Sequence, residues 1–341
     1  MINLLKYYFK KRLYIIGILS IILILLTIME YSGPFVCQTG SGPYENLEPT
    51  NNPLSLFMNC SFILCIIIPL FEFSFKMRKV GVDQLYSFPI KKRKLYITKF
   101  IIGYLEIIIP FTVCFIFMLL RIVLDQRGYV FHLEYYFIYY LLSFLIIFVL
   151  YSYVTLFYVK CNTIYDGVIC VIVALFLPSL LISIAREIMP SNYRELHSYL
   201  RTTYFGIYNT YYNITDRFKD LMDYGYLNEI YNMEYERENL GICLNAILGI
   251  ISFVLFVLTL KFDKAENSMD ISNSWFSYKI LIPILILASM ILAYEKVYII
   301  IVGIVGYIMY AIYRRNFKIK KIDILMIIIM LVLGVIVYNI I

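Results

Sequence analysis

Long apolar runs dominate this sequence and restrict its fold more than any other feature. Nine runs are long enough to form membrane helices, because a helix needs roughly 20 apolar residues to cross the hydrocarbon core. They cover residues 13–29, 54–75, 100–120, 136–159, 167–185, 240–260, 277–293, 297–313 and 323–340. We therefore expect an all-α, polytopic integral membrane helical bundle, with residues 1–341 forming one transmembrane domain of about nine transmembrane helices.

Eight spans are the alternative to nine. Only Tyr294, Glu295 and Lys296 separate the run 277–293 from the run 297–313. One continuous helix over both runs would be much longer than a membrane is thick. We therefore expect a tight helical hairpin at this place.

The composition agrees with a membrane protein. Hydrophobic residues make up 62% of the 341 residues and charged residues only 16%, and the mean hydropathy is +0.79. A soluble globular domain carries about a quarter charged residues. The net charge of +7 is typical of the basic inner loops of membrane proteins, and no soluble domain offers the basic face that nucleic-acid binding needs.

Basic residues predict the orientation, because Lys and Arg concentrate in cytoplasmic loops. With the N-terminus inside, the inner segments hold 21 of the 30 Lys and Arg residues and the outer segments hold 9. Most of the outer ones lie in 186–239, which would be a large extracytoplasmic loop, and long loops cross regardless of charge. The N-terminus is therefore expected to be cytoplasmic, and nine spans would put the C-terminus outside.

The two longest outer segments differ in character. Residues 186–239 are dense in Tyr, and 214–238 mix apolar and charged residues at roughly helical spacing. That pattern predicts one or two amphipathic helices packed on the outer membrane face. Residues 30–53 carry several Gly and Pro residues instead, which predict turns.

Several catalytic motifs are missing from the chain. It contains no G-x-x-x-x-G-K-[ST], so it does not bind ATP through a P-loop, and it contains neither H-E-x-x-H nor G-x-S-x-G. The two histidines, His132 and His197, fall in outer loops, and the seven cysteines show no zinc or disulfide spacing. We therefore expect no enzymatic activity, no catalytic residue, no metal and no cofactor in this chain.

Two acidic residues lie inside the expected spans. Glu72 is near the inner end of its span and can reach Lys76 or Arg78 at the interface. Glu106 lies seven residues after Lys99, so it is roughly 10 Å along the helix. A carboxylate at that depth is costly and usually faces a partner or a wet cavity. Glu106 is therefore the intramembrane candidate, facing either a translocation path or a partner helix.

Prolines fall within or near four of the spans, at positions 69, 110, 178 and 283. Each removes a backbone hydrogen bond and tends to kink its helix. Kinks suit a protein that changes shape, although membrane helices often contain Pro.

The inner segment 76–99 interrupts the apolar runs with a distinctive pattern. Val82, Leu85 and Tyr86 share one helical face. Ser87 can cap a new helix with Pro89 in its first turn, and that helix would continue through the basic run 91–94 into the third span. We expect a short helix along the inner surface, then a break, then re-entry. The segment is either a basic interfacial anchor or a docking surface.

The stretch VDQLYSFPIKKRKLYITKF, residues 82–100, resembles the segment between the second and third spans of bacterial ABC transporter permeases of the type 2 exporter class, particularly the Firmicutes subgroup. That family shows an Asp-x-Leu-x-Ser-Leu-Pro-Ile-Ser-Arg-like run followed by Lys. The matching residues here are Asp83, Leu85, Ser87, Pro89, Ile90, Arg93 and Lys99. Phe88 replaces the usual Leu, and Lys91 replaces the usual Ser.

A second stretch, KFDKAENSMD at 261–270, looks like the family's basic-x-x-Glu-x-x-Gly run after the sixth span. Lys264 and Glu266 are retained, whereas Met269 stands where Gly is usual. The order of the spans, the long outer loop before the sixth and the extra spans after it also agree with the family layout.

The resemblance implies a permease subunit of an ATP-driven exporter in a bacterial cytoplasmic membrane. ATP and magnesium would bind in a separate cytosolic ATPase, and a second permease, identical or not, would complete a dimer. Coupling helices would dock on the ATPase through two inner segments. The first would use Val82, Asp83, Leu85, Tyr86, Ser87, Pro89, Ile90 and Arg93, and the second, at 160–166, would use Asn162 and Asp166. An amphipathic substrate, such as a peptide antibiotic or a lipid-like compound, fits the apolar, Tyr-lined spans.

Two other classes of function stay open. A secondary transporter or channel would need several buried ion-binding acids, and the spans contain few. A non-transport immunity or sensor protein could bind a toxin through the Tyr-rich loop 186–239, since Tyr is common in binding surfaces.

Overall fold

The computed structural model describes residues 2–30, 37–38, 47–48, 53–87, 90–124, 133–188, 229–262, 278–291, 296–314 and 316–340. Within these residues the fold is almost entirely helical. The long helices are α1 (Ile2–Glu30), α2 (Pro53–Phe73), α4 (Lys92–Leu124), α5 (Leu133–Lys160), α6 (Ile164–Ile188), α10 (Glu229–Thr259), α11 (Tyr278–Ile291), α12 (Lys296–Arg314) and α13 (Lys321–Ile340). The short ones are η1 (Ser74–Met77), α3 (Lys79–Tyr86) and η3 (Leu260–Phe262).

One strand pair departs from the helical pattern. β1 (Cys37–Gln38) pairs antiparallel with β2 (Leu47–Glu48), and Cys37 faces Glu48 in the register. The rest of the segment 31–52 lies outside the described residues, as do most of the Tyr-rich loop, both histidines, and Lys264 and Glu266 of the second family-like stretch. The predictions for these parts therefore stay predictions.

Five helices in the described part are long and apolar enough to cross a membrane. They cover Asn3–Met29, Met58–Met77, Lys92–Arg121, Tyr136–Lys160 and Gly241–Thr259. Shorter apolar helices cover Ile164–Leu177, Lys279–Ile291 and Tyr298–Arg314. These helices indicate a membrane-associated protein, and they confirm the expected all-α bundle at that level.

The expected helical hairpin near the C-terminus is present as two helices. α11 ends at Ile291 and α12 begins at Lys296. The two helices pack against each other, and α13 packs against both. The apolar residues of 277–313 therefore form a pair of helices and not one long helix.

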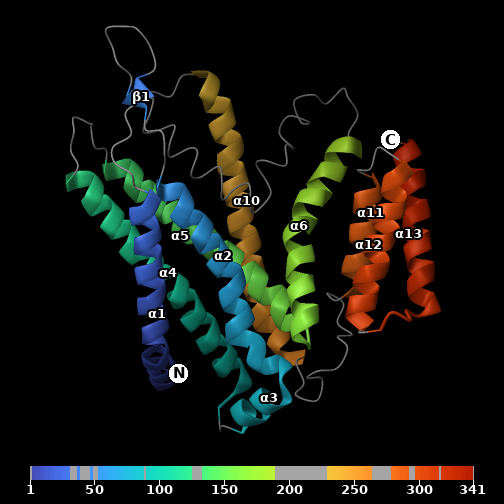
Figure 1. The fold of residues 1–341 in the computed structure, drawn as a ribbon, viewed down its shortest axis with the longest axis horizontal. Helices are drawn as coiled ribbons and strands as arrows, with labels where there is room; N and C mark the ends of the chain where they lie inside the picture. The colour runs from blue at the N-terminus through green and yellow to red at the C-terminus, as the bar shows by residue number, and fades with distance from the viewer. Residues whose placement is uncertain are drawn as a thin grey trace.

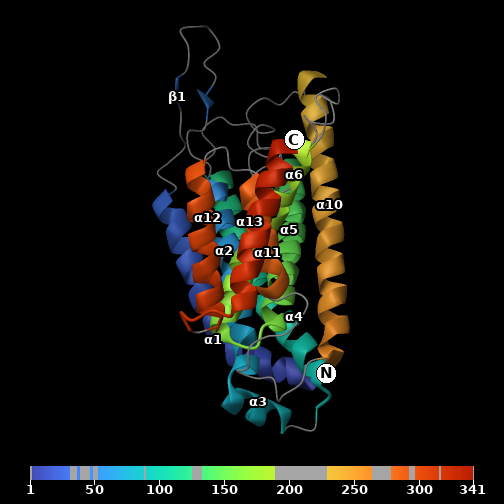
Figure 2. The same cartoon turned by 90° about the vertical axis from the view of Figure 1, so that its right-hand side faces the viewer.

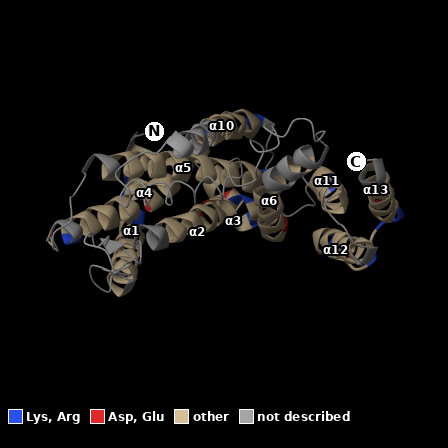
Figure 3. Cartoon of the chain, turned by 90° about the horizontal axis from the view of Figure 1, so that it is seen from above, with Lys and Arg blue, Asp and Glu red and all other residues tan. Residues whose placement is uncertain are grey.

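The helices form a six-helix body (α1, α2, α4, α5, α6 and α10) and a three-helix lobe (α11, α12 and α13). In the body, α1 packs along α4, α2 contacts α4 and α5, and α10 and α6 pack on α5. α5 is the core of the body, because every residue from Tyr151 to Val159 is buried. The lobe contacts the body mainly through α6 and α11, and the view from above shows it at one end of the molecule (Figure 3).

The two chain ends lie at opposite ends of the bundle (Figure 1). α3 and the turn between α12 and α13 are at the same end as the N-terminus (Figures 1 and 2). That turn is closed by an ion pair in which Arg314 Nε and Nη2 donate to the Asp323 carboxylate at 2.5 and 2.9 Å. The chain near these turns also carries the basic run 91–94 after α3 and Lys318, Lys320 and Lys321 beside the α12–α13 turn. Basic residues therefore cluster at the end of the molecule that carries the N-terminus and α3.

Prolines 69, 110 and 283 lie inside helices, as the sequence suggests, and residue 178 is inside α6. A proline at position 178 cannot donate the helical hydrogen bond to the carbonyl of Ala174, four residues earlier. The Tyr153 hydroxyl of α5 donates to this carbonyl instead, at 2.7 Å. Tyr153 and Ala174 are both buried, so this bond satisfies a carbonyl that water cannot reach.

Replacing Tyr153 by Phe should lower the free energy of unfolding by about 1 kcal/mol, because it leaves the Ala174 carbonyl without a donor. Unfolding in mild detergent would measure the loss. In a Pro178→Ala background the restored backbone N–H can serve the same carbonyl, so Tyr153→Phe should cost clearly less there. An equal cost in both backgrounds would contradict this assignment.

Candidate functional site

The chain between α2 and α4 forms a small structure at the N-terminal end of the bundle. η1 follows α2 directly, Arg78 is extended, and α3 then runs from Lys79 to Tyr86. α3 projects beyond the ends of the long helices (Figure 2). The prediction of a short helix followed by a break is confirmed, because helix resumes only at Lys92.

The expected role of Ser87 is wrong. Ser87 ends α3 and does not begin the next helix: its N–H donates to the Asp83 carbonyl at 3.2 Å and its Oγ donates to the Gln84 carbonyl at 2.9 Å. Its backbone is helical, with φ −69° and ψ −19°, whereas an N-cap residue is extended. The Lys91 carbonyl instead accepts the first bond of α4, from the Lys94 N–H at 2.8 Å. Pro89 lies outside the described residues.

The apolar face of α3 faces the bundle. Val82 is buried, Leu85 and Tyr86 are half-buried, and the hydroxyls of Tyr86 and Tyr96 are 2.9 Å apart. Lys92 lies over the Tyr86 ring, 4.6 Å from its centroid. Val82 is therefore covered in this arrangement, whereas Leu85 and Tyr86 keep part of their surface exposed. The docking role expected for these residues stays a prediction.

The other face of α3 is free of the bundle. We call it the outer face of α3; it consists of Lys79, Val80, Asp83 and Gln84, all exposed. Val80 is an apolar side chain with 68% of its surface exposed. Asp83 and Arg93 are exposed as a docking role requires, while Ile90 is half-buried.

Gly81 holds α3 close to η1. A Cβ at this position would lie 2.7 Å from the Phe75 carbonyl oxygen, a backbone atom that cannot move aside. Lys76 of η1 in turn donates a hydrogen bond to the Val159 carbonyl at the end of α5. α3 therefore lies close against the backbone of η1, and η1 is joined to the end of α5 by the Lys76 side chain.

The second predicted docking segment is less exposed than expected. Asp166 is buried, in the first turn of α6, and its N–H donates to Thr163 Oγ1 at 3.3 Å. Asn162 is half-buried. The exposed side chain of this turn is Tyr165, with 71% of its surface exposed. Sequence reasoning missed Tyr165, since no motif distinguishes it from the many other Tyr residues.

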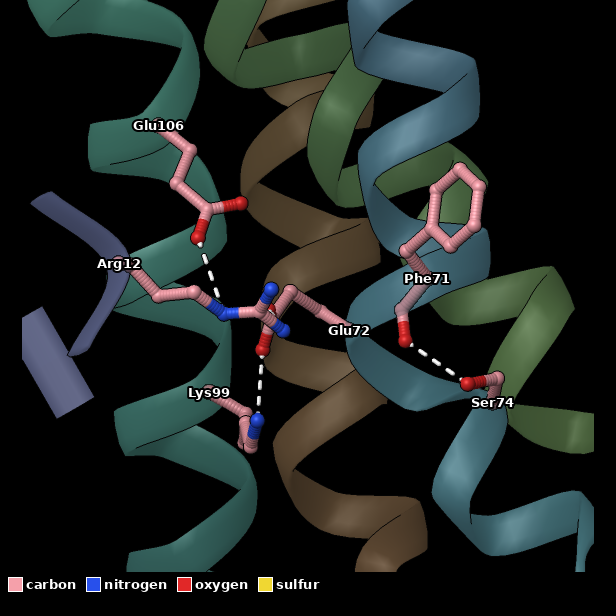
Figure 4. A network of polar contacts seen from close by, with 6 residues as sticks. All are labelled: Arg12, Phe71, Glu72, Ser74, Lys99 and Glu106. Atoms are coloured by element: carbon pink, nitrogen blue, oxygen red, sulfur yellow. Dashed lines mark hydrogen bonds and ion pairs between the residues drawn. The ribbon is translucent and has the colours of Figure 1, made fainter. Parts of the chain in front are cut away.

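A buried charge network lies where α1, α2 and α4 meet (Figure 4). Lys99 Nζ donates to Glu72 Oε2 at 2.8 Å, and Arg12 Nη2 pairs with Glu72 Oε1. Arg12 Nε lies 3.4 Å from Glu106 Oε1. Figure 4 shows the Arg12 guanidinium between the carboxyl groups of Glu72 and Glu106. We call these four residues the charge network.

The sequence-based view of Glu72 is corrected by this network. Glu72 is only 2% exposed and pairs with Arg12 and Lys99, not with the interfacial Lys76 or Arg78. The reason is its position on the side of α2 that faces α1 and α4. Lys76, the expected partner, is turned toward the Val159 carbonyl.

Glu106 is buried, with 3% of its surface exposed, and it faces a partner helix, α1. This is one of the two roles that its depth suggested. In the sequence, Arg12 is one of the basic residues of the inner segments, and Lys99 is another that also belongs to the family-like run. Lys99 and Glu106 are seven residues apart and therefore share one helical face. This spacing is the signal in the sequence that could have indicated a charge network on α4.

The network balances two cations against two anions. Isolated charges are costly in the apolar part of a membrane, so such residues usually pair with each other. Removing one member of a buried pair leaves the other uncompensated and is strongly destabilising. The network therefore holds α1, α2 and α4 together at the N-terminal end of the bundle.

Tyr151 of α5 brings a fourth helix to this place. Its buried hydroxyl has no hydrogen-bond partner among the described residues, and it lies close enough to Glu72 and Glu106 to interact with both electrostatically. It can approach because α4 has Gly103 there: a Cβ at Gly103 would collide with the hydroxyl. The Tyr151 ring also packs against Phe100, with centroids 4.9 Å apart.

Gly103→Ala should therefore destabilise the protein by about 1–3 kcal/mol through overpacking. Tyr151→Phe removes the colliding oxygen and should recover part of that loss, since the next ring atom lies 3.2 Å from the new Cβ. Thermal unfolding of the two single variants and the double variant would measure this. Additive losses in the double variant would contradict the predicted collision.

Among the described residues, no group of three or more His, Cys, Asp or Glu side chains could hold a metal ion. No protein-family model, no curated protein and no solved structure matches the chain.

Proposed function

We propose that this chain is the membrane-spanning permease subunit of an ATP-driven exporter, and that a separate cytosolic ATPase docks on the outer face of α3. One observation carries the proposal. A short helix lies beyond the bundle, is attached to it by its inner face, and presents an exposed outer face with an apolar residue among charged ones. A rigidly held surface helix of this kind suits the transmission of force from a soluble partner.

The proposal includes nine spans with a cytoplasmic N-terminus, in a bacterial cytoplasmic membrane. Eight of the nine apolar runs fall within one described helix or, for two of them, a helix with its short 3₁₀ extension, and α11 covers residues 278–291 of the run 277–293. The N-terminus, α3 and the α12–α13 turn lie at one end of the molecule (Figure 1). That end carries most of the basic residues, as cytoplasmic loops do.

Movement of α3 would reach the spans through a short series of aromatic contacts. Tyr86 of α3 bonds Tyr96 of α4, and the Tyr96 ring lies 6.0 Å from Phe73 of α2 and 5.5 Å from Phe75 of η1. Two residues of the charge network lie within one helical turn of these rings: Glu72 is next to Phe73 in α2, and Lys99 is three residues after Tyr96 in α4. A shift of α3 would therefore act on α2 and α4 together.

ATP binding in the partner must favour one packing of the spans over another through different contacts in the two states. ATP and magnesium would bind only in the ATPase, and a second permease would complete a dimer. The substrate would be amphipathic, because the spans expose apolar surface with few charges. This substrate class rests on the resemblance in residues 82–100.

The test is purification of the tagged full-length chain from its native membranes in mild detergent. We expect a P-loop ATPase in stoichiometric amount whose ATP turnover depends on the chain. Recovery of the chain alone, both with and without mild chemical cross-linking before extraction, would refute the proposal. A co-purified ATPase whose turnover ignores the chain would refute it as well.

An ion-coupled secondary transporter is the second candidate, and one observation favours it. Glu72 and Glu106 are both buried on the neighbouring helices α2 and α4, and buried acids mark ion pathways in membrane proteins. Transport by the purified chain in vesicles, driven by an ion gradient without any ATPase, would select this candidate.

A further inference from the structure

α1 is held to the body unevenly. Many of its side chains along the apolar stretch are exposed, including Leu13, Ile18 and Leu25. At its N-terminal half, one side chain, Arg12, reaches between α2 and α4 and pairs with a carboxylate on each (Figure 4). The Arg12 side chain is itself 26% exposed. Tyr8 also contacts the body in this half, with Lys99 Nζ 4.5 Å from its ring centroid, but Arg12 supplies the charge that pairs with the two carboxylates. The docking of this half of α1 therefore depends in large part on the Arg12 guanidinium at the edge of the body.

The two carboxylates depend on Arg12 to different degrees. Glu72 also has Lys99 at 2.8 Å, on α4. Among the described residues, Arg12 is the cation that forms an ion pair with Glu106, with Arg12 Nε 3.4 Å from Glu106 Oε1. The same Oε1 accepts no hydrogen bond from the described residues. If α1 moves away, Glu72 keeps Lys99 at ion-pair distance, whereas Glu106 loses the cation that forms an ion pair with it and keeps only the more distant Lys99.

A buried carboxylate without a cation takes up a proton more readily than it stays charged. The structure thus points to Glu106 as a proton-binding site whose occupancy controls the docking of α1: we propose that Glu106 is ionised while Arg12 is docked and protonated when α1 is released. The proton would come from water and enter at the edge of the body where the Arg12 side chain is partly exposed. The proposal concerns the chain alone and does not depend on the proposed ATPase.

The groups around Glu106 are consistent with two states. Arg12 faces it from α1, Glu72 from α2 and Lys99 from α4 itself, and Tyr151 lies nearby on α5. Protonation of Glu106 would leave Arg12 and Lys99 with Glu72 as their shared carboxylate. The Tyr151 hydroxyl has no hydrogen-bond partner among the described residues. It could then accept a hydrogen bond from the neutral acid or donate one to it.

Linkage gives the direction of the effect. The docked state binds one proton fewer than the released state, so lowering the pH favours release. By the same reciprocity, anything that pulls α1 away makes Glu106 bind a proton more tightly. α1 should therefore be firmly docked at mildly alkaline pH and loosened at mildly acidic pH.

Hydrogen–deuterium exchange of residues 2–30 tests this on the full-length chain in nanodiscs of zwitterionic lipid, with exchange rates corrected for their intrinsic pH dependence. In the unaltered protein, protection of the N-terminal half of α1 should fall by about tenfold or more from mildly alkaline to mildly acidic pH. The amides of α5 should keep their protection over the same range and serve as the internal reference.

Variants identify the group. Glu106→Gln imitates the protonated state, so its α1 should be loose at both pH values, while the matched control Asp83→Asn, an exposed carboxylate, should keep the normal pH response. The proposal is overturned if the unaltered protein shows no pH response in α1, a result that needs no variant to fold. It is equally overturned if folded Glu106→Gln responds to pH as the unaltered protein does.

Discussion

Replacing Glu72 by Gln is expected to lower the free energy of unfolding by about 3–5 kcal/mol, the range found when one member of a buried ion pair is removed. Glu72 is 2% exposed and is the only member of the charge network paired with both of its cations. The substitution leaves Arg12 and Lys99 with Glu106 as the remaining carboxylate of the network. Unfolding in mild detergent, followed by intrinsic fluorescence, would measure the loss.

The matched control is Asp83→Asn, which removes an exposed carboxylate and should change the stability by less than about 0.5 kcal/mol. Adding Lys99→Met to Glu72→Gln removes the cation that Glu72 holds at 2.8 Å. The double variant should lose less stability than the sum of the two single losses, because residues in one network couple. A loss near zero for Glu72→Gln would show that the network does not hold the helices together.

Val80→Asp is expected to weaken the binding of the proposed ATPase by about 30-fold or more, the effect of losing an interface residue worth roughly 2 kcal/mol. Val80 is the apolar residue of the outer face of α3 and is 68% exposed. An aspartate there would place an unpaired charge in the proposed interface. The stability of the chain alone should stay unchanged, because the side chain does not pack on the bundle.

Phe317→Asp is the control for this prediction. Phe317 lies in the α12–α13 turn, at the same end of the bundle as α3, and is 81% exposed. It should leave the binding of the ATPase intact, as measured by titration of the purified partners. Equal weakening by both substitutions would point to a nonspecific effect of charge, and binding unaffected by Val80→Asp would remove α3 from the interface.

The helices and the short surface helix could be predicted from the sequence because their signals are local. Apolar runs and their interruptions mark each span, and the runs on either side of residues 294–296 form the expected pair of helices. The end of α3 was harder to place. Ser87 can cap a helix at either end, and its hydrogen bonds to Asp83 and Gln84 decide which.

The candidate site was predicted in part. The depth of Glu106 in its span indicated a buried carboxylate with a partner helix, and the structure places it against α1. Its partner Arg12 is far away in the chain, so no spacing rule connects them. The resemblance implies a docking role for Asp166, whereas the structure buries Asp166 and exposes Tyr165 beside it.

The sequence by itself determined that α3 has two unlike faces, that α2 and α4 each carry one acid, and that basic residues gather at one end. The spacing of apolar residues and the charges along a segment are properties of that segment alone, so they can be recognised without knowing which helix packs against it. Only the tertiary structure decided that Val82 faces inward and Val80 outward, and that Arg12 bridges Glu72 and Glu106. Those outcomes depend on how helices rotate against each other, because a buried charge is stable only where another helix supplies its opposite.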